Sequence, residues 1–253
     1  MICRDWIKIL NLDIAGCTIL SASMAELVIH GQQAGLYQMT NHLMSGRTRM
    51  SRLKTIENIM IVSHLDDETI FGACELFHLD NWYVISVTGS SDPNKDPFKK
   101  VMELFGISKY KIYNGHDLIN LNNEGSFMGK DTLKEISDNI KRDLDGIEYS
   151  RVVTHGPLGE YGHPDHQATY RMVRDMVDTS KLYVFADPNF GYKPNTDEEV
   201  NDIRQEAVRL YAEAAGGSAE WLNEIARTFN CGRAIDIKDY ESTDKWQEEK
   251  DNV

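Results

Sequence analysis

Two short histidine motifs about a hundred residues apart carry the side chains of this chain that could do chemistry. They offer imidazole nitrogens and carboxylate oxygens, which are ligands that suit a divalent metal such as Zn²⁺. Spare carboxylates beside them could act on a water molecule that such a metal activates. The first motif is His64-Leu65-Asp66-Asp67-Glu68, and the second is His163-Pro164-Asp165-His166, preceded by Tyr161-Gly162.

The spacing within the motifs predicts a metal site with one open position. His64 and Asp67 are three residues apart, and at a strand-to-helix turn this offset can aim both side chains at one point. His166 would be the third protein ligand. Three protein ligands leave a position for water, as in catalytic rather than structural zinc sites. We therefore expect one Zn²⁺ per chain, although Fe²⁺ or Co²⁺ would suit a similar set of nitrogen and oxygen ligands.

The other polar residues of the motifs could transfer protons. Asp66 could take a proton from the water, because a metal lowers the pKa of that water to about 7. His163 could stabilise an oxyanion or protonate a leaving amine, with Asp165 orienting or charging its ring. Tyr161 could also reach a developing oxyanion. These roles together predict a zinc-type amide hydrolase.

Either motif alone would have a simpler explanation. The first would most often be an acidic helix start, and the second would most often be a turn. Their co-occurrence, each after a predicted strand, favours a shared site. Nearby residues are interpreted more simply. His155 could support a metal ligand but is interpreted as a surface or loop histidine, and Glu160 could line the mouth of the site but is interpreted as a solvent-facing loop acid. Glu68 is either a solvated helix-start acid or a hydrogen-bond partner of a ligand or of the following loop.

Strands and helices alternate from Lys54 onward, which predicts an α/β fold with a mostly parallel sheet covered by helices on both faces. In such sheets ligands bind outside the carboxyl ends of the strands, and both motifs fall there. The predicted strands are Ile59–Ser63, Trp82–Thr88, Lys109–Tyr113, Arg151–Thr154 and Leu182–Ala186, and the predicted helices are Asp67–Phe77, Pro97–Phe105, Asp131–Leu144, Pro164–Val177, Asp197–Ala215 and Ala219–Thr228.

The chain divides into three parts by sequence pattern. Residues 1–50 have loop-like segments and weak helical periodicity, and we interpret them as an N-terminal extension. Residues 51–238 form the predicted working domain, and residues 239–253 a charged C-terminal tail. The extension could be poorly ordered, could be an oligomer contact, which would make the protein a homo-oligomer, or could lie outside the working protein.

The composition disfavours several classes of partner. The chain has 253 residues, and a hydrophobic content of 41% supports a sizeable core. Its net charge of −13 disfavours nucleic acids and anionic membranes, because both need a basic face. No apolar run reaches the roughly 18 residues that a membrane span requires. We expect a small-molecule substrate instead.

The cysteines indicate an intracellular protein. The chain has four cysteines and no Cys-x-x-Cys pair, so neither a structural zinc site nor a disulfide framework is indicated. Scattered thiols are typical of reducing compartments. A signal peptide fits poorly, because Asp13 interrupts the apolar N-terminal stretch. We therefore predict a cytoplasmic location.

The two motifs together resemble those of the LmbE-like, or PIG-L, family of zinc-dependent N-acetylglucosaminyl deacetylases. The family's first motif is typically Ala/Pro-His-Pro-Asp-Asp-Glu, and its second is His-Pro-Asp-His. The resemblance spans roughly residues 56–183 and, more weakly, the helix around Tyr211. It implies a Rossmann-like fold. It also implies zinc ligands His64, Asp67 and His166, a general base Asp66, an electrostatic or acid partner His163, and a tyrosine near the substrate carbonyl, Tyr161.

The sequence departs from the family pattern at Leu65, at Lys95 and near Asn114–Asp117, where the family's frequent aspartate after the third strand has no clear match. Leu65 replaces the usual proline, which alters backbone stiffness between a ligand and the base. Lys95 stands where the family often has an arginine that contacts the sugar or a phosphate, so the charge is kept without the bidentate geometry. We expect Lys95 and Glu68 to contact the substrate.

The resulting hypothesis is a metal-dependent hydrolase that removes an N-acetyl group from an N-acetylglucosamine-type amino sugar or its conjugate. The same residues would serve hydrolysis of another N-acyl compound, such as an acylated antibiotic or a thiol conjugate. A different alternative is a non-catalytic carbohydrate-binding relative. The presence of Asp66, a base that a pure binding protein does not need, speaks against that alternative.

Overall fold

The structure is a computed structural model that describes residues 56–89, 95–115, 130–214, 220–230 and 232–243. The predicted extension at 1–50 and residues 244–253 of the predicted tail lie outside these ranges. In the part of the chain that the structure describes, no helix combines the length and the apolar character that a bilayer span requires.

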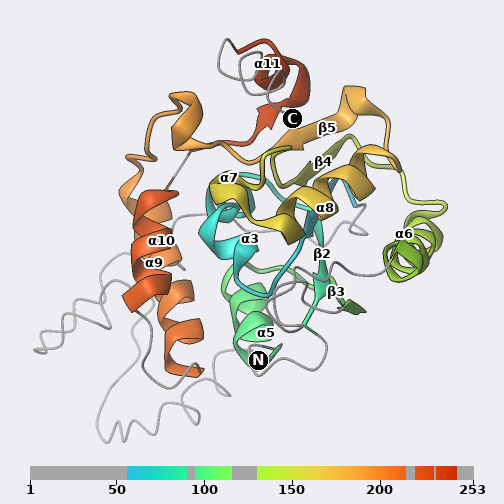
Figure 1. The fold of residues 1–253 in the computed structure, drawn as a ribbon. Helices are drawn as coiled ribbons and strands as arrows, with labels where there is room; N and C mark the ends of the chain where they lie inside the picture. The colour runs from blue at the N-terminus through green and yellow to red at the C-terminus, as the bar shows by residue number, and fades with distance from the viewer. Residues whose placement is uncertain (1–55, 90–94, 116–129, 215–219, 231, 244–253) are drawn as a thin grey trace, which may run out of the picture. The chain divides into compact units, whose positions relative to one another are not determined.

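The centre of the fold is a six-stranded, mostly parallel sheet with the strand order β3-β2-β1-β4-β5-β6 (Figure 1). Only β6 runs antiparallel to its neighbour among the paired strands of this sheet. The strands are β1 (Asn58–Val62), β2 (Trp82–Thr88), β3 (Lys109–Gly115), β4 (Arg151–Thr154), β5 (Leu182–Val184) and β6 (Ile235–Asp236).

The strand order changes direction between β1 and β4. The chain builds outward from β1 through β2 to β3, and then returns to place β4 on the other side of β1. Connections that leave adjacent strands toward opposite sides open a crevice at their carboxyl ends, where ligands bind in folds of this kind. The first motif directly follows β1, and the second follows β4 by way of a short loop. The topology therefore brings both motifs to the same crevice.

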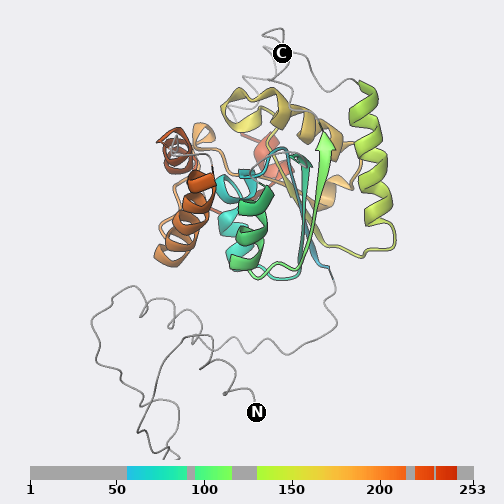
Figure 2. The same cartoon turned by 90° about the horizontal axis from the view of Figure 1, so that it is seen from below.

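Helices cover both faces of the sheet, so the fold has the predicted three layers. Figure 2 shows α5 and α9 on one side of the sheet and α6 on the other. The described helices are α3 (Asp67–Ile70), α4 (Ala73–His78), α5 (Lys95–Leu104), α6 (Lys130–Leu144), α7 (Gly159–Gly162), α8 (Pro164–Arg174), α9 (Glu198–Ala214), α10 (Glu220–Thr228) and α11 (Ile237–Glu241), with 3₁₀ turns η2 (Thr179–Lys181) and η3 (Pro188–Phe190).

Alternating side chains of β1 divide the core between the two faces. Met60 and Val62 pack in a cluster with residues of α3, α4, α5, α9 and α10. Ile59 and Ile61 pack in a second cluster with residues of α6, α8 and α11. Because side chains of a strand alternate between faces, a strand buried on both sides is apolar throughout, as the sequence of β1 is. This buried strand is the rigid support for the first motif.

The structure corrects three details of the sequence interpretation. The helix predicted over 67–77 is two short helices separated at Phe71 and Gly72, and a side chain at Gly72 would collide with Met60 and with the Glu68 carbonyl. The loop predicted before the second motif contains α7. A further strand and helix, β6 and α11, were missed, and α11 crosses the predicted domain boundary at Asp239. Tyr240 beyond that boundary is buried in the core.

A buried arginine of α9 binds backbone carbonyls of α3, the helix that begins within the first motif, and of α10, which gives a testable stability prediction. Arg204 donates from Nε to the Thr69 carbonyl at 3.3 Å, and from its terminal nitrogen to the Ile70 carbonyl at 2.9 Å and to the Ala226 carbonyl. Replacing Arg204 by Met would leave these carbonyls without that donor. We expect the free energy of unfolding to fall by about 2–4 kcal/mol in urea denaturation, since buried polar groups without partners are costly.

The matched control for this prediction is Arg209 on the exposed face of the same helix. Its guanidinium pairs with Glu206 and Glu213 at the surface. Exposed ion pairs contribute little, so Arg209→Met should leave the urea midpoint close to that of the wild type. Equal urea midpoints for the two variants would contradict a stabilising role of the buried Arg204 hydrogen bonds.

Candidate active site

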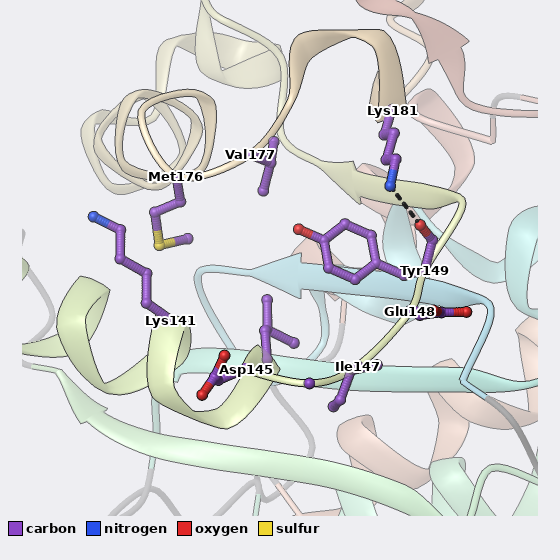
Figure 3. A pocket seen from close by; sticks show the side chains of 10 residues that line it. Lys141, Asp145, Ile147, Glu148, Tyr149, Met176, Val177 and Lys181 are labelled. Atoms are coloured by element: carbon purple, nitrogen blue, oxygen red, sulfur yellow. Dashed lines mark hydrogen bonds between the residues drawn. The ribbon is translucent and has the colours of Figure 1, made fainter.

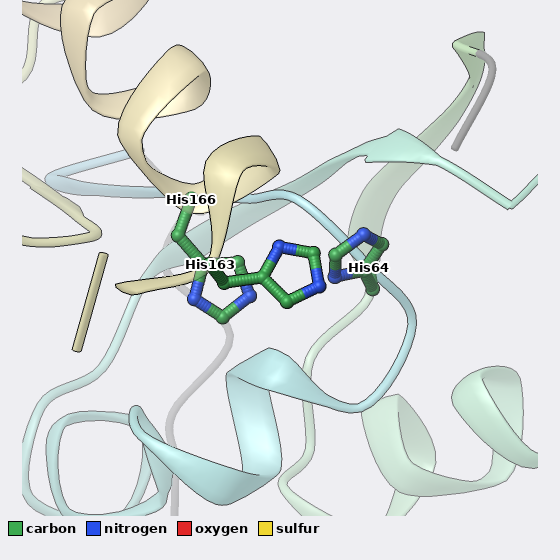
Figure 4. A group of neighbouring side chains, drawn as sticks. All are labelled: His64, His163 and His166. Carbon is green, nitrogen blue, oxygen red and sulfur yellow. The ribbon is translucent and has the colours of Figure 1, made fainter. Parts of the chain in front are cut away.

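The three histidines of the motifs meet at the carboxyl ends of β1 and β4. His64 comes from the turn after β1, His163 precedes α8, and His166 lies in the first turn of α8. Figure 4 shows their rings grouped together. The centroids of His163 and His166 are 4.4 Å apart, and those of His64 and His163 are 4.8 Å apart. Residues about a hundred positions apart thus share one small volume.

Asp67 lies at the centre of the group and is buried. Its Oδ2 accepts a hydrogen bond from the backbone N–H of His64 at 2.7 Å and lies 3.4 Å from His64 Nδ1. Its Oδ1 lies 3.4 Å from Nε2 of His166. His64 and His166, two of the ligands implied by the family resemblance, thus lie beside different oxygens of the third, Asp67. Among the described residues, the groups whose ligand atoms lie close enough for one ion are His64, His163 and His166, and Asp67, His155 and His166. Metal binding by His64, Asp67 and His166 stays a prediction.

The hydrogen bonds of the two ligand histidines identify which nitrogens face the centre. Nε2 of His64 lies 2.9 Å from a carboxylate oxygen of Asp165, which can only accept, so Nδ1 is the nitrogen left toward Asp67. Nδ1 of His166 lies 2.6 Å from Glu160 in the same way, so Nε2 is left. In the described residues, Nε2 of His166 is buried without a hydrogen-bond partner. Two imidazole nitrogens and a carboxylate fit a divalent ion such as Zn²⁺.

The carboxylates around the histidines favour positive charge at the centre. Burial lowers the pKa of His166, but Asp67 and Glu160 outweigh burial and raise this pKa to about 9. Burial also opposes the charged form of His64, and Asp67 and Asp165 raise its pKa well above the usual value. A metal ion would take the place of the protons held here, so its binding should release protons.

Asp66 borders this centre in an unusual backbone conformation, with φ 154° and ψ −22°. Its backbone N–H donates to Glu68 Oε2 at 3.1 Å, and its carbonyl accepts from the N–H groups of Thr69 and Ile70. Burial, and then the charge of Asp67, raise the pKa of the Asp66 carboxyl well above its usual value. A carboxylate with a raised pKa holds a proton more readily, as a general base must.

His163 and Asp165 differ from the sequence expectation. Asp165 was expected to orient the ring of His163 with its side chain, but that carboxylate contacts His64 instead. The backbone N–H of Asp165 donates to Nδ1 of His163 at 3.2 Å, so Nε2 of His163 carries its hydrogen. Burial and the neighbouring histidines lower the pKa of His163 to about 4. The ring is thus a neutral donor, suited to an oxyanion.

Tyr161 and Lys95 lie at positions open to solvent. Tyr161 is 46% exposed, and its ring packs edge-on to His163 with a centroid distance of 5.5 Å. Burial, and then the charges of nearby carboxylates, raise the pKa of the phenol, which therefore keeps its proton and can donate it in a hydrogen bond. Lys95 is an exposed residue at the beginning of α5, after the carboxyl end of β2. Its contact with a substrate stays a prediction.

Glu68 points into the protein. It is fully buried, and its carboxylate accepts from the Asp66 backbone, from the Thr69 hydroxyl at 2.9 Å and from the Tyr211 hydroxyl at 2.6 Å. Burial raises its pKa to about 7. The expectation that Glu68 contacts the substrate is therefore corrected, because its oxygens are used to hold the turn that carries Asp66.

The contact between Tyr211 and Glu68 gives a second prediction. Tyr211→Phe removes the hydroxyl that donates to the buried carboxylate and leaves the ring in place. We expect a loss of about 1–3 kcal/mol in the free energy of unfolding, measured by urea denaturation. Tyr110→Phe, on the edge strand β3, serves as the control. Equal losses in the two variants would argue against a special role of the Tyr211 hydroxyl.

For two residues of the site, the sequence interpretation preferred the simpler of two alternatives. His155 and Glu160 were interpreted as an ordinary loop histidine and a solvent-facing acid, but both are buried. His155 Nε2 lies 3.3 Å from Asp67, and its Nδ1 lies 3.0 Å from Glu160. One signal could have found His155, since it directly follows a buried strand, much as His64 follows β1. Glu160 had no comparable signal.

A separate cavity of about 640 Å³, drawn in Figure 3, lies at the amino ends of β4 and β5. Its lining comes from the segments that precede β4 and β5, which are the amino ends of those strands. Lys181 donates to the Tyr149 carbonyl there at 2.9 Å. Because the histidine motifs follow the carboxyl ends of β1 and β4, this cavity is not part of the candidate active site.

Comparisons of sequence gave a distant relative. No family model matches the chain. An uncharacterized protein of Acanthamoeba polyphaga mimivirus is 28% identical over 141 residues, which are 51% of this chain and 61% of that protein. The chain thus spans about three fifths of the length of this curated relative.

Comparisons of structure gave three similar folds. The N,N'-diacetylchitobiose deacetylase from Pyrococcus horikoshii, solved with its inhibitor MPG, matches with a TM-score of 0.52 and 13% identity, over 86% of this chain and 98% of that chain. A conserved protein from Thermus thermophilus matches at 0.49 and 13%, over 68% and 85%. An antimicrobial pseudoaglycone deacetylase matches at 0.48 and 14%, over 71% and 94%. At such identities the first of these similarities establishes a shared fold.

Proposed function

We propose that this chain, which has the fold of the LmbE-like, or PIG-L, deacetylases, is a metal-dependent hydrolase of N-acetylated amino sugars. The substrate would be an N-acetylglucosamine-type sugar or its conjugate, and the products acetate and the free amine. The observation that carries the proposal is that His64 and His166 both contact the carboxylate of Asp67, beside Asp66 at the sheet crevice. The shared fold with a diacetylchitobiose deacetylase supports it.

His64, Asp67 and His166 would hold the metal, through the nitrogens that their hydrogen bonds leave toward the centre. When bound, a divalent ion such as Zn²⁺ would acidify water and polarise the amide carbonyl. The proposed stoichiometry is one ion per chain.

Asp66 would accept the proton of the attacking water and later pass it to the leaving amine. Its raised pKa suits both steps, because the acid must hold the proton between them. His163 would donate its Nε2 hydrogen to the oxyanion that forms from the carbonyl oxygen. The Tyr161 phenol, which keeps its proton, would be a second donor to that oxygen.

Asp165 would orient one ligand in this scheme. Its carboxylate accepts from Nε2 of His64 and is buried, so it fixes the ring and the nitrogen that faces Asp67. This replaces the role in which Asp165 orients His163 with its side chain.

The same residues would hydrolyse another N-acyl compound, and Lys95 at the position of a frequent family arginine favours testing for one. We propose to measure metal content and acetate release from N-acetylglucosamine, its simple conjugates and a panel of other N-acyl compounds. About one metal ion per chain and acetate release from the sugars would support the proposal. Metal without sugar turnover would favour another N-acyl substrate, and no metal after reconstitution with Zn²⁺ would favour a carbohydrate-binding protein.

A further inference from the structure

We propose that Glu160 is a positioning residue that holds the hydrogen of His166 on Nδ1, beside the stacked ring of His155, and thereby prepares the Nε2 ligand atom of His166. This inference rests on the proposed function, since it gives Glu160 a purpose in metal binding. It assigns a role to a residue outside both motifs, in the turn between β4 and the second motif.

One buried carboxylate receives three hydrogen bonds at this turn. Oε2 of Glu160 lies 2.6 Å from Nδ1 of His166 and 3.0 Å from Nδ1 of His155. Oε1 accepts from the backbone N–H of Gly156 at 2.8 Å. Glu160 is 5% exposed and both histidines are fully buried. The carboxylate therefore forms its contacts away from bulk water, where hydrogen bonds are strong and unsatisfied donors are costly.

The second nitrogen of His155 settles its tautomer. Nε2 of His155 accepts from the backbone N–H of Ser63 at 3.0 Å, so the ring hydrogen is on Nδ1 and is donated to Glu160. A lone pair used by Ser63 is not available for a metal. Asp67, His155 and His166 are close enough to be grouped as metal ligands by distance. Because its Nε2 lone pair is already used, we interpret His155 as a residue that borders the site and does not bind the metal.

The rings of His155 and His166 lie almost parallel, which explains how one oxygen serves both. Their centroids are 3.9 Å apart and their planes differ by 21°. The stacked rings present their Nδ1 atoms to the same Oε2 of Glu160 and so share one orientation. The opposite nitrogens then face Asp67, where only that of His166 is without a hydrogen-bond partner in the described part of the chain.

The backbone at Glu160 indicates that the carboxylate is needed at this position. Its φ of 53° and ψ of −75° lie outside the helical region, in a conformation that side chains disfavour and glycine tolerates. Strained backbone of this kind persists at functional sites when the surroundings hold it in place. A residue chosen only for the turn would be glycine, as at Gly159 and Gly162 on either side, which also have positive φ.

Glu160→Gln tests the proposal because three N–H donors need three acceptor positions. The amide keeps the size of the side chain but has one acceptor oxygen, and its NH₂ group opposes at least one of the donors. The matched control is Glu198→Gln, at an exposed glutamate that begins α9. Affinity for Zn²⁺ alone would be measured by competition with a chromophoric chelator, and histidine tautomers by ¹⁵N NMR with and without Zn²⁺.

We expect Zn²⁺ affinity to fall roughly 10–100-fold in Glu160→Gln and to stay at the wild-type value in Glu198→Gln. We also expect the Zn²⁺-loaded wild type to show His166 bound through Nε2 with its hydrogen on Nδ1, and Glu160→Gln to lose this single form. Wild-type affinity together with unchanged tautomers in Glu160→Gln would overturn the proposal. If circular dichroism shows that the variant does not fold, Glu160→Asp replaces it, and a smaller loss of affinity is expected there, whereas none would overturn the proposal.

These readouts separate this inference from the proposed function. Wild-type protein that binds Zn²⁺ but releases no acetate would contradict the deacetylase proposal and leave the Glu160 comparison valid. Wild-type protein that binds no Zn²⁺ would contradict the metal centre. In that case the role of Glu160 in preparing a ligand of that centre would be rejected as well.

Discussion

Asp66→Asn should lower the rate of acetate release by about 10²–10⁴-fold while the protein keeps one metal ion per chain. The amide is nearly the same size as the carboxyl group but cannot accept the proton of the attacking water. The ligand atoms of His64, Asp67 and His166 are unchanged, so metal binding should survive. The measurement is acetate release with each protein's metal content determined in parallel.

The control for this substitution is Asp96→Asn on α5. The Asp96 side chain is 82% exposed and pairs with Lys99 of the same helix, so a charge is lost without any change at the site. Hydrolysis should continue at the wild-type rate. If Asp66→Asn, fully loaded with metal, also hydrolysed at that rate, Asp66 would not be the base and another group would have to take the proton.

His166→Ala should abolish both metal binding and hydrolysis. It removes the nitrogen that is buried, that faces Asp67 and that has no other hydrogen-bond partner in the described residues. The decisive measurement is the increase in stability on adding Zn²⁺. A ligand at 100 times its Kd stabilises the native state by about 2.7 kcal/mol, so the wild type should gain about this much and the variant nothing.

The zinc-dependent gain is a better measure than stability itself. Truncating a buried ring lowers stability by loss of packing and leaves Glu160 without one donor, whether or not a metal binds. His78→Ala, at an exposed histidine that pairs with Asp197, serves as the control and should keep the full gain. A similar gain in His166→Ala would show that the metal binds elsewhere.

Removal of the metal from the wild type by a chelator is the companion experiment. Acetate release should stop and return on addition of Zn²⁺, because the ligands and Asp66 remain in place. Activity that persists in metal-free protein would contradict the proposed function, and it would do so independently of any substitution.

The sequence predicted the fold well where local pattern and burial agree. The strands Trp82–Thr88 and Arg151–Thr154 were predicted with their observed bounds. Short runs rich in β-branched and aromatic residues, flanked by polar residues, are typical of buried strands. It failed where tertiary packing interrupts a local pattern. The helix predicted from Asp67 is broken at Gly72, and β6 and α11 are too short to carry a periodicity.

The sequence by itself determined which side-chain types make up the site and which strand ends carry them. The residues of each motif can be read directly from the sequence, and an apolar run shows where a buried strand ends. Only the tertiary structure decided which hydrogen-bond partner each of these side chains has. Asp165 pairs with His64, 101 positions away, rather than with its neighbour His163, and Glu68 meets Tyr211, 143 positions away. Glu160 reaches two histidines through a strained turn. Hydrogen bonds depend on where the folded chain returns in space, and spacing along the sequence does not contain that information.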